Sequence, residues 1–244
     1  MRDGVGKKQK KRKMRANMSE DSNGSQYGFG NASRYPYYYG KGGRLVLVDN
    51  ALEAVNKGST TIGIKTSEFA LISSHIKPTL PLVDPNEKIF TIDKHIGATG
   101  AGYIADIEQL IEEVRLQAQK HRLSYESPID VKSLAKHLST YLHNYTIYAV
   151  RPQAASIIIA GTDESGLQLY EVDPSGTYLK GSGFAIGNSS DTALEEIQKG
   201  YSKNMSIEQA LELSNSAIEK AVGEKSIIES GIVTAKDGFK IVKY

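Results

Sequence analysis

Ser59 is the residue of this 244-residue chain whose position first raises the question of covalent chemistry. It stands directly after Gly58, where a predicted helix passes into a predicted strand. A serine hydroxyl is a weak nucleophile until a neighbouring base takes its proton. Two interpretations are open: Ser59 is a nucleophile waiting to be exposed, or it is an ordinary strand residue held behind a helix.

Other familiar catalytic and metal-binding patterns are missing from the sequence. It contains no Gly-rich phosphate loop, no His-x-x-x-His pair and no Gly-x-Ser-x-Gly turn. His137 and His143 lie six residues apart on one predicted helix and do not share a face well enough to bind zinc together. The chain has no cysteine, which excludes disulfides and thiolate sites. We expect no metal site and no cofactor.

The stretch 43–66 is the part of the chain that must position Ser59. Its first half has apolar residues at the spacing of one helix face, namely Val48, Ala51, Leu52 and Val55. Asp49 is a plausible N-terminal cap, and Gly58 fits the position just past the helix end. The β-branched run at 60–64 then predicts a strand. A short helix therefore feeds directly into a strand at Ser59.

Beyond Ser59, blocks of strands alternate with pairs of helices. Hydrophobic periodicity predicts strands at 60–64, 69–73, 89–92, 96–99, 156–160, 168–172, 177–186, 231–235 and 239–242. It predicts helices from 104 to 118, from about 129 to 142, and at 191–201 and 207–222. Asp173-Pro174-Ser175-Gly176 has the composition of a hairpin turn, and Ser206 with Gln209 that of a capping box. The order favours an α+β fold of two sheets packed face to face with helices outside.

Composition and charge separate a globular body from a basic tail. Hydrophobic residues make up 39% of the chain and charged residues 24%, as in a soluble globular protein. Residues 1–18 hold eight lysines and arginines against Asp3 alone, a net charge of +7, which leaves the rest at −5. We expect a disordered tail over 1–33 and a single domain over 34–244. An acidic body makes nucleic acid an unlikely ligand for that domain.

The basic tail and the hydropathy of the chain also bear on where in the cell the protein is found. The basic run is interpreted as a solvated arm, with nuclear targeting or nucleic-acid contact as alternatives. No apolar run approaches the roughly 18 residues of a membrane span, and no signal peptide is evident. We expect a cytoplasmic protein that does not contact membranes.

A set of short motifs in this order and spacing resembles the α-type subunits of the proteasome core particle, of archaeal style. The resemblance covers residues 34–244 nearly without gaps. The motifs that carry it are Gly43-Arg44-Leu45, Ala51-Leu52-Glu53-Ala54-Val55, Lys57-Gly58-Ser59-Thr60, Glu87-Lys88-Ile89, Val150-Arg151-Pro152, Ser156, Asp173-Pro174-Ser175-Gly176 and Ala185-Ile186-Gly187.

The resemblance implies a fold and a set of partners. The fold is the four-layer αββα sandwich of the N-terminal-nucleophile hydrolases, with two antiparallel sheets and an additional N-terminal helix. The partners are a homo- or hetero-heptameric α ring, the catalytic β-type subunits, a hexameric regulatory ATPase and unfolded protein substrates in transit. The implied function is that of a non-catalytic ring subunit that gates substrate access in ATP-dependent protein degradation.

The resemblance also implies a test for Ser59. In β-type relatives a propeptide is cut before a threonine, and the freed amine serves as base for the threonine hydroxyl. Ser59 matches that position, so the alternative function is a self-processing hydrolase that uses Ser59. Two correspondences argue against that function. The position of the acidic residue that assists catalysis in β-type subunits is occupied here by His75. The lysine that tunes the amine in β-type subunits can be matched only to Lys88, and only with a short deletion. The extra helix also covers the cleft. We therefore interpret Ser59 as a vestigial nucleophile position.

The α-type family has a gate formed by converging N-terminal segments. Its Tyr-Asp-Arg motif falls on Ala32, Ser33 and Arg34, so only the arginine is retained, and its proline and second tyrosine fall on Lys41 and Asn50. The aromatic cluster from Tyr35 to Tyr39 could take the place of the missing gate residues by stacking around the pore, or it could pack onto the subunit's own body. We expect the gate residues to be Arg34, Tyr35, Tyr37, Tyr38 and Tyr39.

The family also has pockets between neighbouring subunits that receive the C-terminal tails of the ATPase, with a lysine pairing the tail carboxylate. That lysine falls on His75, two residues before Lys77, and strand alternation places both on one side. The candidate pocket residues are His75, Lys77 and Lys88, with Lys77 or a protonated His75 as receptor of the carboxylate. The alternative is that they are merely exposed residues at strand ends.

Overall fold

The computed structural model describes residues 45–77, 80–147 and 151–242. The chain divides into two units, Met1–Tyr38 and Tyr39–Tyr244, and the described residues all belong to the second unit. The predicted domain boundary after residue 33 lies outside the described residues and stays a prediction.

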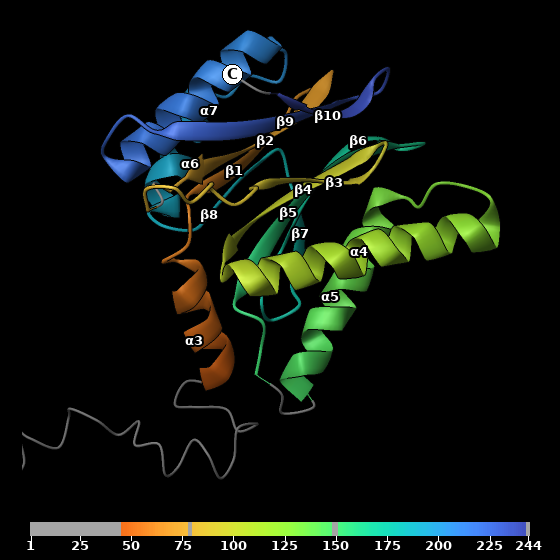
Figure 1. Ribbon diagram of the computed structural model, residues 1–244. Helices are drawn as coiled ribbons and strands as arrows, with labels where there is room; N and C mark the ends of the chain where they lie inside the picture. The colour runs from red at the N-terminus through yellow and green to blue at the C-terminus, as the bar shows by residue number, and fades with distance from the viewer. Residues whose placement is uncertain (1–44, 78–79, 148–150, 243–244) are drawn as a thin grey trace, which may run out of the picture. The chain divides into compact units, whose positions relative to one another are not determined.

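In the described part of the chain, ten strands form two antiparallel sheets of five (Figure 1). The first sheet has the order β10-β9-β2-β1-β8, and the second has the order β3-β4-β5-β6-β7. The strands of the first sheet are β1 (Thr61–Lys65), β2 (Phe69–Ile76), β8 (Gly183–Ile186), β9 (Ile227–Thr234) and β10 (Gly238–Val242). Those of the second are β3 (Ile89–Asp93), β4 (Ile96–Gly102), β5 (Ala155–Asp163), β6 (Gly166–Val172) and β7 (Tyr178–Lys180).

Two pairs of helices cover the outer faces of the sheets (Figure 1). Helices α4 (Ile104–Tyr125) and α5 (Val131–Ile147) pack on the second sheet, and α6 (Ser190–Gly200) and α7 (Ile207–Val222) pack on the first. A third apolar cluster, which includes Ile72, Ile158 and Leu169, lies between the sheets. Helix α3 (Val46–Val55) contributes Val55 to it. The predicted αββα sandwich with an additional N-terminal helix is confirmed.

One predicted strand is wrong. The periodicity of 177–186 suggests a single strand, but β7 belongs to one sheet and β8 to the other. The Gly181 N–H donates to the Leu169 carbonyl of β6 at 3.2 Å, and the Lys65 N–H donates to the Ser182 carbonyl at 2.8 Å. The chain therefore changes sheets between Gly181 and Ser182, where its backbone partner changes from β6 to β1.

The predicted turn and cap are confirmed. Between β6 and β7, the Asp173 carboxylate accepts hydrogen bonds from the N–H groups of Ser175 at 2.8 Å and Thr177 at 3.1 Å, and Gly176 has a φ of 84°. Ser206 and Gln209 form both hydrogen bonds of the capping box that starts α7. These local signals need only neighbouring residues, so the sequence predicts them well.

The cap predicted for the first helix is wrong. Leu45 is the N-cap of α3, and the backbone is already helical from Val46. The Asp49 N–H donates to the Leu45 carbonyl at 3.0 Å, which places Asp49 at the end of the first turn. A carboxylate there still interacts favourably with the positive end of the helix dipole.

Glu171 is an acidic side chain on a face that is otherwise apolar. It lies opposite Ile158 in the β5–β6 ladder, so its side chain is directed toward the other sheet. Burial, with a smaller contribution from Asp173, raises the pKa of Glu171 from its ordinary 4.5 to about 7. The neutral form is therefore favoured in the fold, and the stability it contributes below pH 4.5 is lost as the pH rises through about 7.

We expect Glu171→Gln to stabilise the protein at pH 8 by about 1 to 2 kcal/mol, because an uncharged amide replaces a partly buried carboxylate. The gain should shrink as the pH falls from 8 to 5. Urea unfolding across that range measures it. Glu164→Gln, in the exposed turn between β5 and β6, is the control and should show no such pH dependence. An equal effect of Glu171→Gln at pH 8 and pH 5 would contradict the assignment.

Candidate functional site

The junction between α3 and β1 is closed by backbone packing. The Gly58 N–H donates to the Val55 carbonyl at 2.8 Å, just beyond the end of α3. A Cβ atom at Gly58 would lie 2.4 Å from the Gly102 nitrogen. The sequence predicts glycine here as a helix-ending residue, but Gly58 does not have a positive φ. Its lack of a side chain is required because β4 approaches so closely.

Ser59 lies inside this junction, with 4% of its surface exposed. Gly187, with a φ of 89°, packs against its carbonyl, and a Cβ atom at Gly187 would lie 2.1 Å from that oxygen. The Asn188 N–H donates to the Gly58 carbonyl at 3.2 Å, and the Thr60 hydroxyl donates to the Asn188 carbonyl at 2.8 Å. The peptide bond before Ser59 is thus held by the segment that follows β8.

No group among the described residues is placed to activate the Ser59 hydroxyl. The Ser59 nitrogen is part of a peptide bond, so it offers no free amine. Within 45–77, 80–147 and 151–242, no residue hydrogen-bonds the Ser59 hydroxyl. The neighbouring Thr61 hydroxyl bonds instead to the Ser59 carbonyl at 3.2 Å and to Ser74 at 2.7 Å. Ser59 lies two residues before β1 rather than in a strand, and it is buried, so the geometry supports a structural residue held behind the helix and not the self-processing hydrolase.

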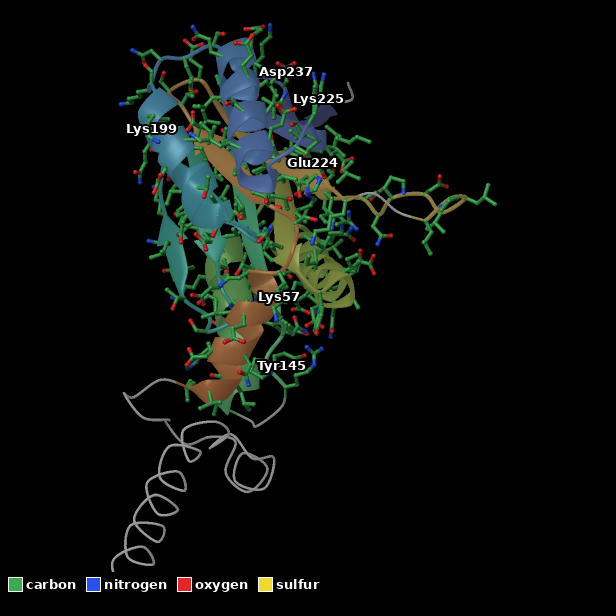
Figure 2. The ribbon with its side chains drawn as sticks, turned by 90° about the vertical axis from the view of Figure 1, so that its left-hand side faces the viewer. Lys57, Tyr145, Lys199, Glu224, Lys225 and Asp237 are labelled. Atoms are coloured by element: carbon green, nitrogen blue, oxygen red, sulfur yellow. The ribbon has the colours of Figure 1, made fainter. Side chains whose placement is uncertain are left out.

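The three predicted pocket residues lie together beside this junction. His75 is 7% exposed near the end of β2, and its backbone N–H donates to the Thr60 carbonyl at 2.9 Å. Lys77 follows β2 and is exposed. Its ammonium donates to the Lys57 carbonyl at 2.9 Å, just after α3. Figure 2 labels Lys57 beside α3.

Lys88 completes the group, which we call the β2-end cluster: His75, Lys77 and Lys88. The Lys88 N–H donates to a Glu229 carboxylate oxygen of β9 at 2.8 Å, and its carbonyl accepts from the Thr99 hydroxyl at 2.8 Å. Its side chain is half-buried. These backbone contacts hold Lys88 at the start of β3.

The electrostatics of the cluster favour an incoming anion. Burial, and then the Lys77 charge, lower the pKa of Lys88, against the opposing effect of Glu229. Burial, and then Lys77, also lower the pKa of His75, with Glu224 opposing this effect and Lys88 adding to it. His75 therefore favours its neutral form, and the positive charge of the cluster resides on the two lysines.

Sequence reasoning missed the two acidic neighbours of the cluster. The predicted strand begins at Gly231, whereas β9 begins at Ile227, so Glu229 lies inside a strand opposite Ser74. Glu224 lies in the turn between α7 and β9, where Figure 2 labels it next to Lys225. The Ile227-Ile228 pair before Glu229 was the signal that could have extended the strand.

The remaining predictions concern the gate, metal sites and membrane spans. The proposed gate residues Arg34, Tyr35, Tyr37, Tyr38 and Tyr39 lie outside the described residues. Within the described part of the chain, no three or more His, Asp or Glu side chains gather as they would around a metal ion. In the same part, every helix is too short or too polar to cross a membrane.

The close approach at Ser59 predicts that alanine substitution destabilises the protein to different extents at two glycines of similar φ, 89° at Gly187 and 88° at Gly166. A Cβ atom at Gly166 meets nothing within 4 Å, so Gly166→Ala should cost only the backbone strain, about 1 to 2 kcal/mol. Gly187→Ala should cost about 2 kcal/mol more, because its methyl group overlaps the Ser59 carbonyl. Chemical denaturation of both variants measures the difference, and equal losses would contradict the packing described.

Comparison with known proteins agrees with this geometry. The sequence matches the protein family described as "Proteasome subunit" over residues 55–236. It is 42% identical over 191 residues to the "Proteasome subunit alpha" of Methanothermobacter thermautotrophicus, covering 77% of each chain. It is 37% identical to the protein of that name from Methanopyrus kandleri, covering 81% of this chain and 82% of the relative. For the Pyrococcus horikoshii relative the identity is 38%, covering 80% and 76%. The chain therefore belongs to the proteasome subunit family, on its non-catalytic α-type branch.

Proposed function

We propose that this protein forms the outer ring of a proteasome core particle in the cytoplasm, where it gates the passage of unfolded proteins and docks a hexameric regulatory ATPase. The observation that carries the proposal is the β2-end cluster, which places two lysines and a neutral histidine beside the closed junction at Ser59. A tail carboxylate is the anion that such a cluster suits.

Within the cluster, Lys77 and Lys88 are the proposed receptors of the tail carboxylate. Lys88 is half-buried, and Glu229 offsets only part of the lowering of its pKa, so an anion would lower the cost of its burial. Lys77 is exposed, and among the described residues its ammonium donates only to a neutral carbonyl, that of Lys57. A carboxylate is a stronger acceptor than a carbonyl and would compete for that ammonium. His75, being neutral, is the weaker candidate.

Exposed apolar side chains support assembly with other subunits. Between β2 and β3, Leu80, Leu82 and Val83 are 75%, 107% and 54% exposed. Large apolar side chains left exposed near one another can mark interaction sites on soluble proteins. We assign this segment to contacts within the proposed heptameric α ring, homomeric or heteromeric, with β-type subunits stacked on that ring.

The gate is assigned to Arg34, Tyr35, Tyr37, Tyr38 and Tyr39. These residues precede α3 within a dozen positions, and α3 lies at the end of the sandwich next to the β2-end cluster. A tail that draws Lys77 away from the Lys57 carbonyl would act on the helix that follows the gate. This connection supports a link between docking and gating.

The docking proposal predicts that Lys77→Met weakens binding of a regulatory ATPase to the assembled particle by roughly tenfold, the value of one charge-assisted hydrogen bond. Lys225→Met, in the nearby turn before β9, is the control and should bind normally. Surface plasmon resonance with intact and C-terminally amidated tail peptides measures the effect. Unchanged affinity for the double variant Lys77→Met/Lys88→Met, in particles shown to be assembled, would exclude this cluster as the receptor.

The gating proposal predicts that removal of residues 1–40 increases hydrolysis of long peptides by the assembled particle severalfold, because it deletes the residues assigned to the gate. Removal of residues 1–18 alone deletes the basic run but keeps Arg34 and the tyrosines, so it should leave hydrolysis unchanged. Fluorogenic peptide assays on particles of matched β-subunit content compare the two. If the longer truncation leaves peptide hydrolysis unchanged, these residues do not form the gate.

A further inference from the structure

Three lysines from separate segments meet at the end of the sandwich opposite Ser59. Lys65 is the last residue of β1, and Lys180 is the last residue of β7. Lys203 lies in the turn between α6 and α7. We call these residues the three-lysine cluster. The β2-end cluster lies at the start of β1, where the backbone N–H of His75 bonds to the Thr60 carbonyl, whereas Lys65 is at the other end of β1. The two clusters are therefore distinct.

Backbone hydrogen bonds fix the three segments relative to one another. The Lys65 N–H donates to the carbonyl of Ser182, two residues after Lys180, at 2.8 Å. Ser67 donates to the Lys203 carbonyl from its N–H at 2.9 Å and from its hydroxyl at 3.1 Å. The Tyr201 hydroxyl donates to the Lys65 carbonyl at 2.9 Å. The fold therefore holds the three segments that carry these lysines side by side.

The charges of the cluster are not compensated by acidic side chains. Among the described residues, none of the three lysines forms an ion pair, whereas Lys199 lies 3.9 Å from both Glu195 and Glu196. Burial, then Lys180 and then Lys203, lower the pKa of Lys65, and within the part of the chain that the structure describes no carboxylate opposes them. Like charges held together in this way leave an unfavourable energy that a bound anion removes.

We propose that the three-lysine cluster is a binding site for a multivalent phosphate-type anion, namely a chain of two or three phosphates. Lysine ammonium groups bind phosphate oxygens as point charges, without the fixed geometry that arginine imposes. Groups placed on three segments suit an anion long enough to contact more than one of them. The Tyr170 ring, over which the Lys180 ammonium lies 6.0 Å from the centroid, is 3% exposed, so it offers no open face on which a base could stack.

The reactivity of Lys65 toward an acetylating reagent tests the proposal on the full chain. Only the unprotonated amine reacts, and each unit of pKa changes its fraction about tenfold. A bound triphosphate raises the pKa of Lys65, so we expect its acetylation rate to fall roughly tenfold on adding tripolyphosphate, relative to chloride at equal ionic strength. Peptide mass spectrometry follows each lysine separately, which keeps the basic N-terminal tail out of the readout.

Two comparisons make the result specific. The double variant Lys180→Gln/Lys203→Gln should abolish the triphosphate-dependent protection of Lys65, whereas Lys199→Gln, on α6 and labelled in Figure 2, should retain it. ATP should protect as well as tripolyphosphate does, since only phosphates are recognised. Equal protection of Lys65 and Lys199, no protection by tripolyphosphate, or protection only by ATP or by an acidic peptide would each overturn the proposal.

Discussion

The approach of Gly187 to the carbonyl of Ser59 is the contact on which this end of the molecule depends. No side chain fits between them, and the same is true of Gly58 against Gly102. These contacts bring the segment after β8, the end of β4 and the start of β1 to one point. Helix α3 can close that point only because the backbones meet without intervening side chains. The junction is therefore determined by sterics before any side-chain chemistry acts.

Two cationic regions lie at opposite ends of the first sheet, and they differ in their neighbours. The β2-end cluster has Glu224 and Glu229 beside it, which partly offset the burial of His75 and Lys88. In the three-lysine cluster, no carboxylate of the described residues opposes the lowering of the Lys65 pKa. A region with acidic neighbours can release an anion readily, because its charges remain partly paired when the anion leaves. A region without them gains more from an anion that stays bound.

The sequence predicted the elements well and their close contacts poorly, for a physical reason. Hydrophobic periodicity and turn composition are local properties, so the helix pairs, the turn at Asp173 and the capping box at Ser206 could be predicted from neighbouring residues alone. The change of sheets at Gly181 depends on two backbone partners that are distant in the chain, Leu169 and Lys65. No local sequence pattern identifies a backbone hydrogen-bond partner that is distant in the chain.

The candidate site also combines features that the sequence could predict with features that it could not. The resemblance in sequence brought His75, Lys77 and Lys88 into consideration, and their spacing along β2 and at the start of β3 could be predicted. The acidic groups that oppose the lowering of the pKa of His75 and of Lys88, Glu224 and Glu229, come from the C-terminal part of the chain, which the pairing of β9 with β2 brings beside the cluster. The glycine at position 58 was expected for its backbone freedom, whereas its actual role is to admit β4.

A sealed junction and an activated serine at position 59 are physically incompatible. Activation needs a free amine at Ser59, which requires a cut after Gly58, but the Gly58 carbonyl accepts a hydrogen bond from Asn188 and α3 continues directly into that peptide. A cut would release α3 from β1 and leave Lys77 without the carbonyl of Lys57. The contacts that keep this end of the sandwich closed thus also hold the peptide bond that leaves Ser59 without a free amine.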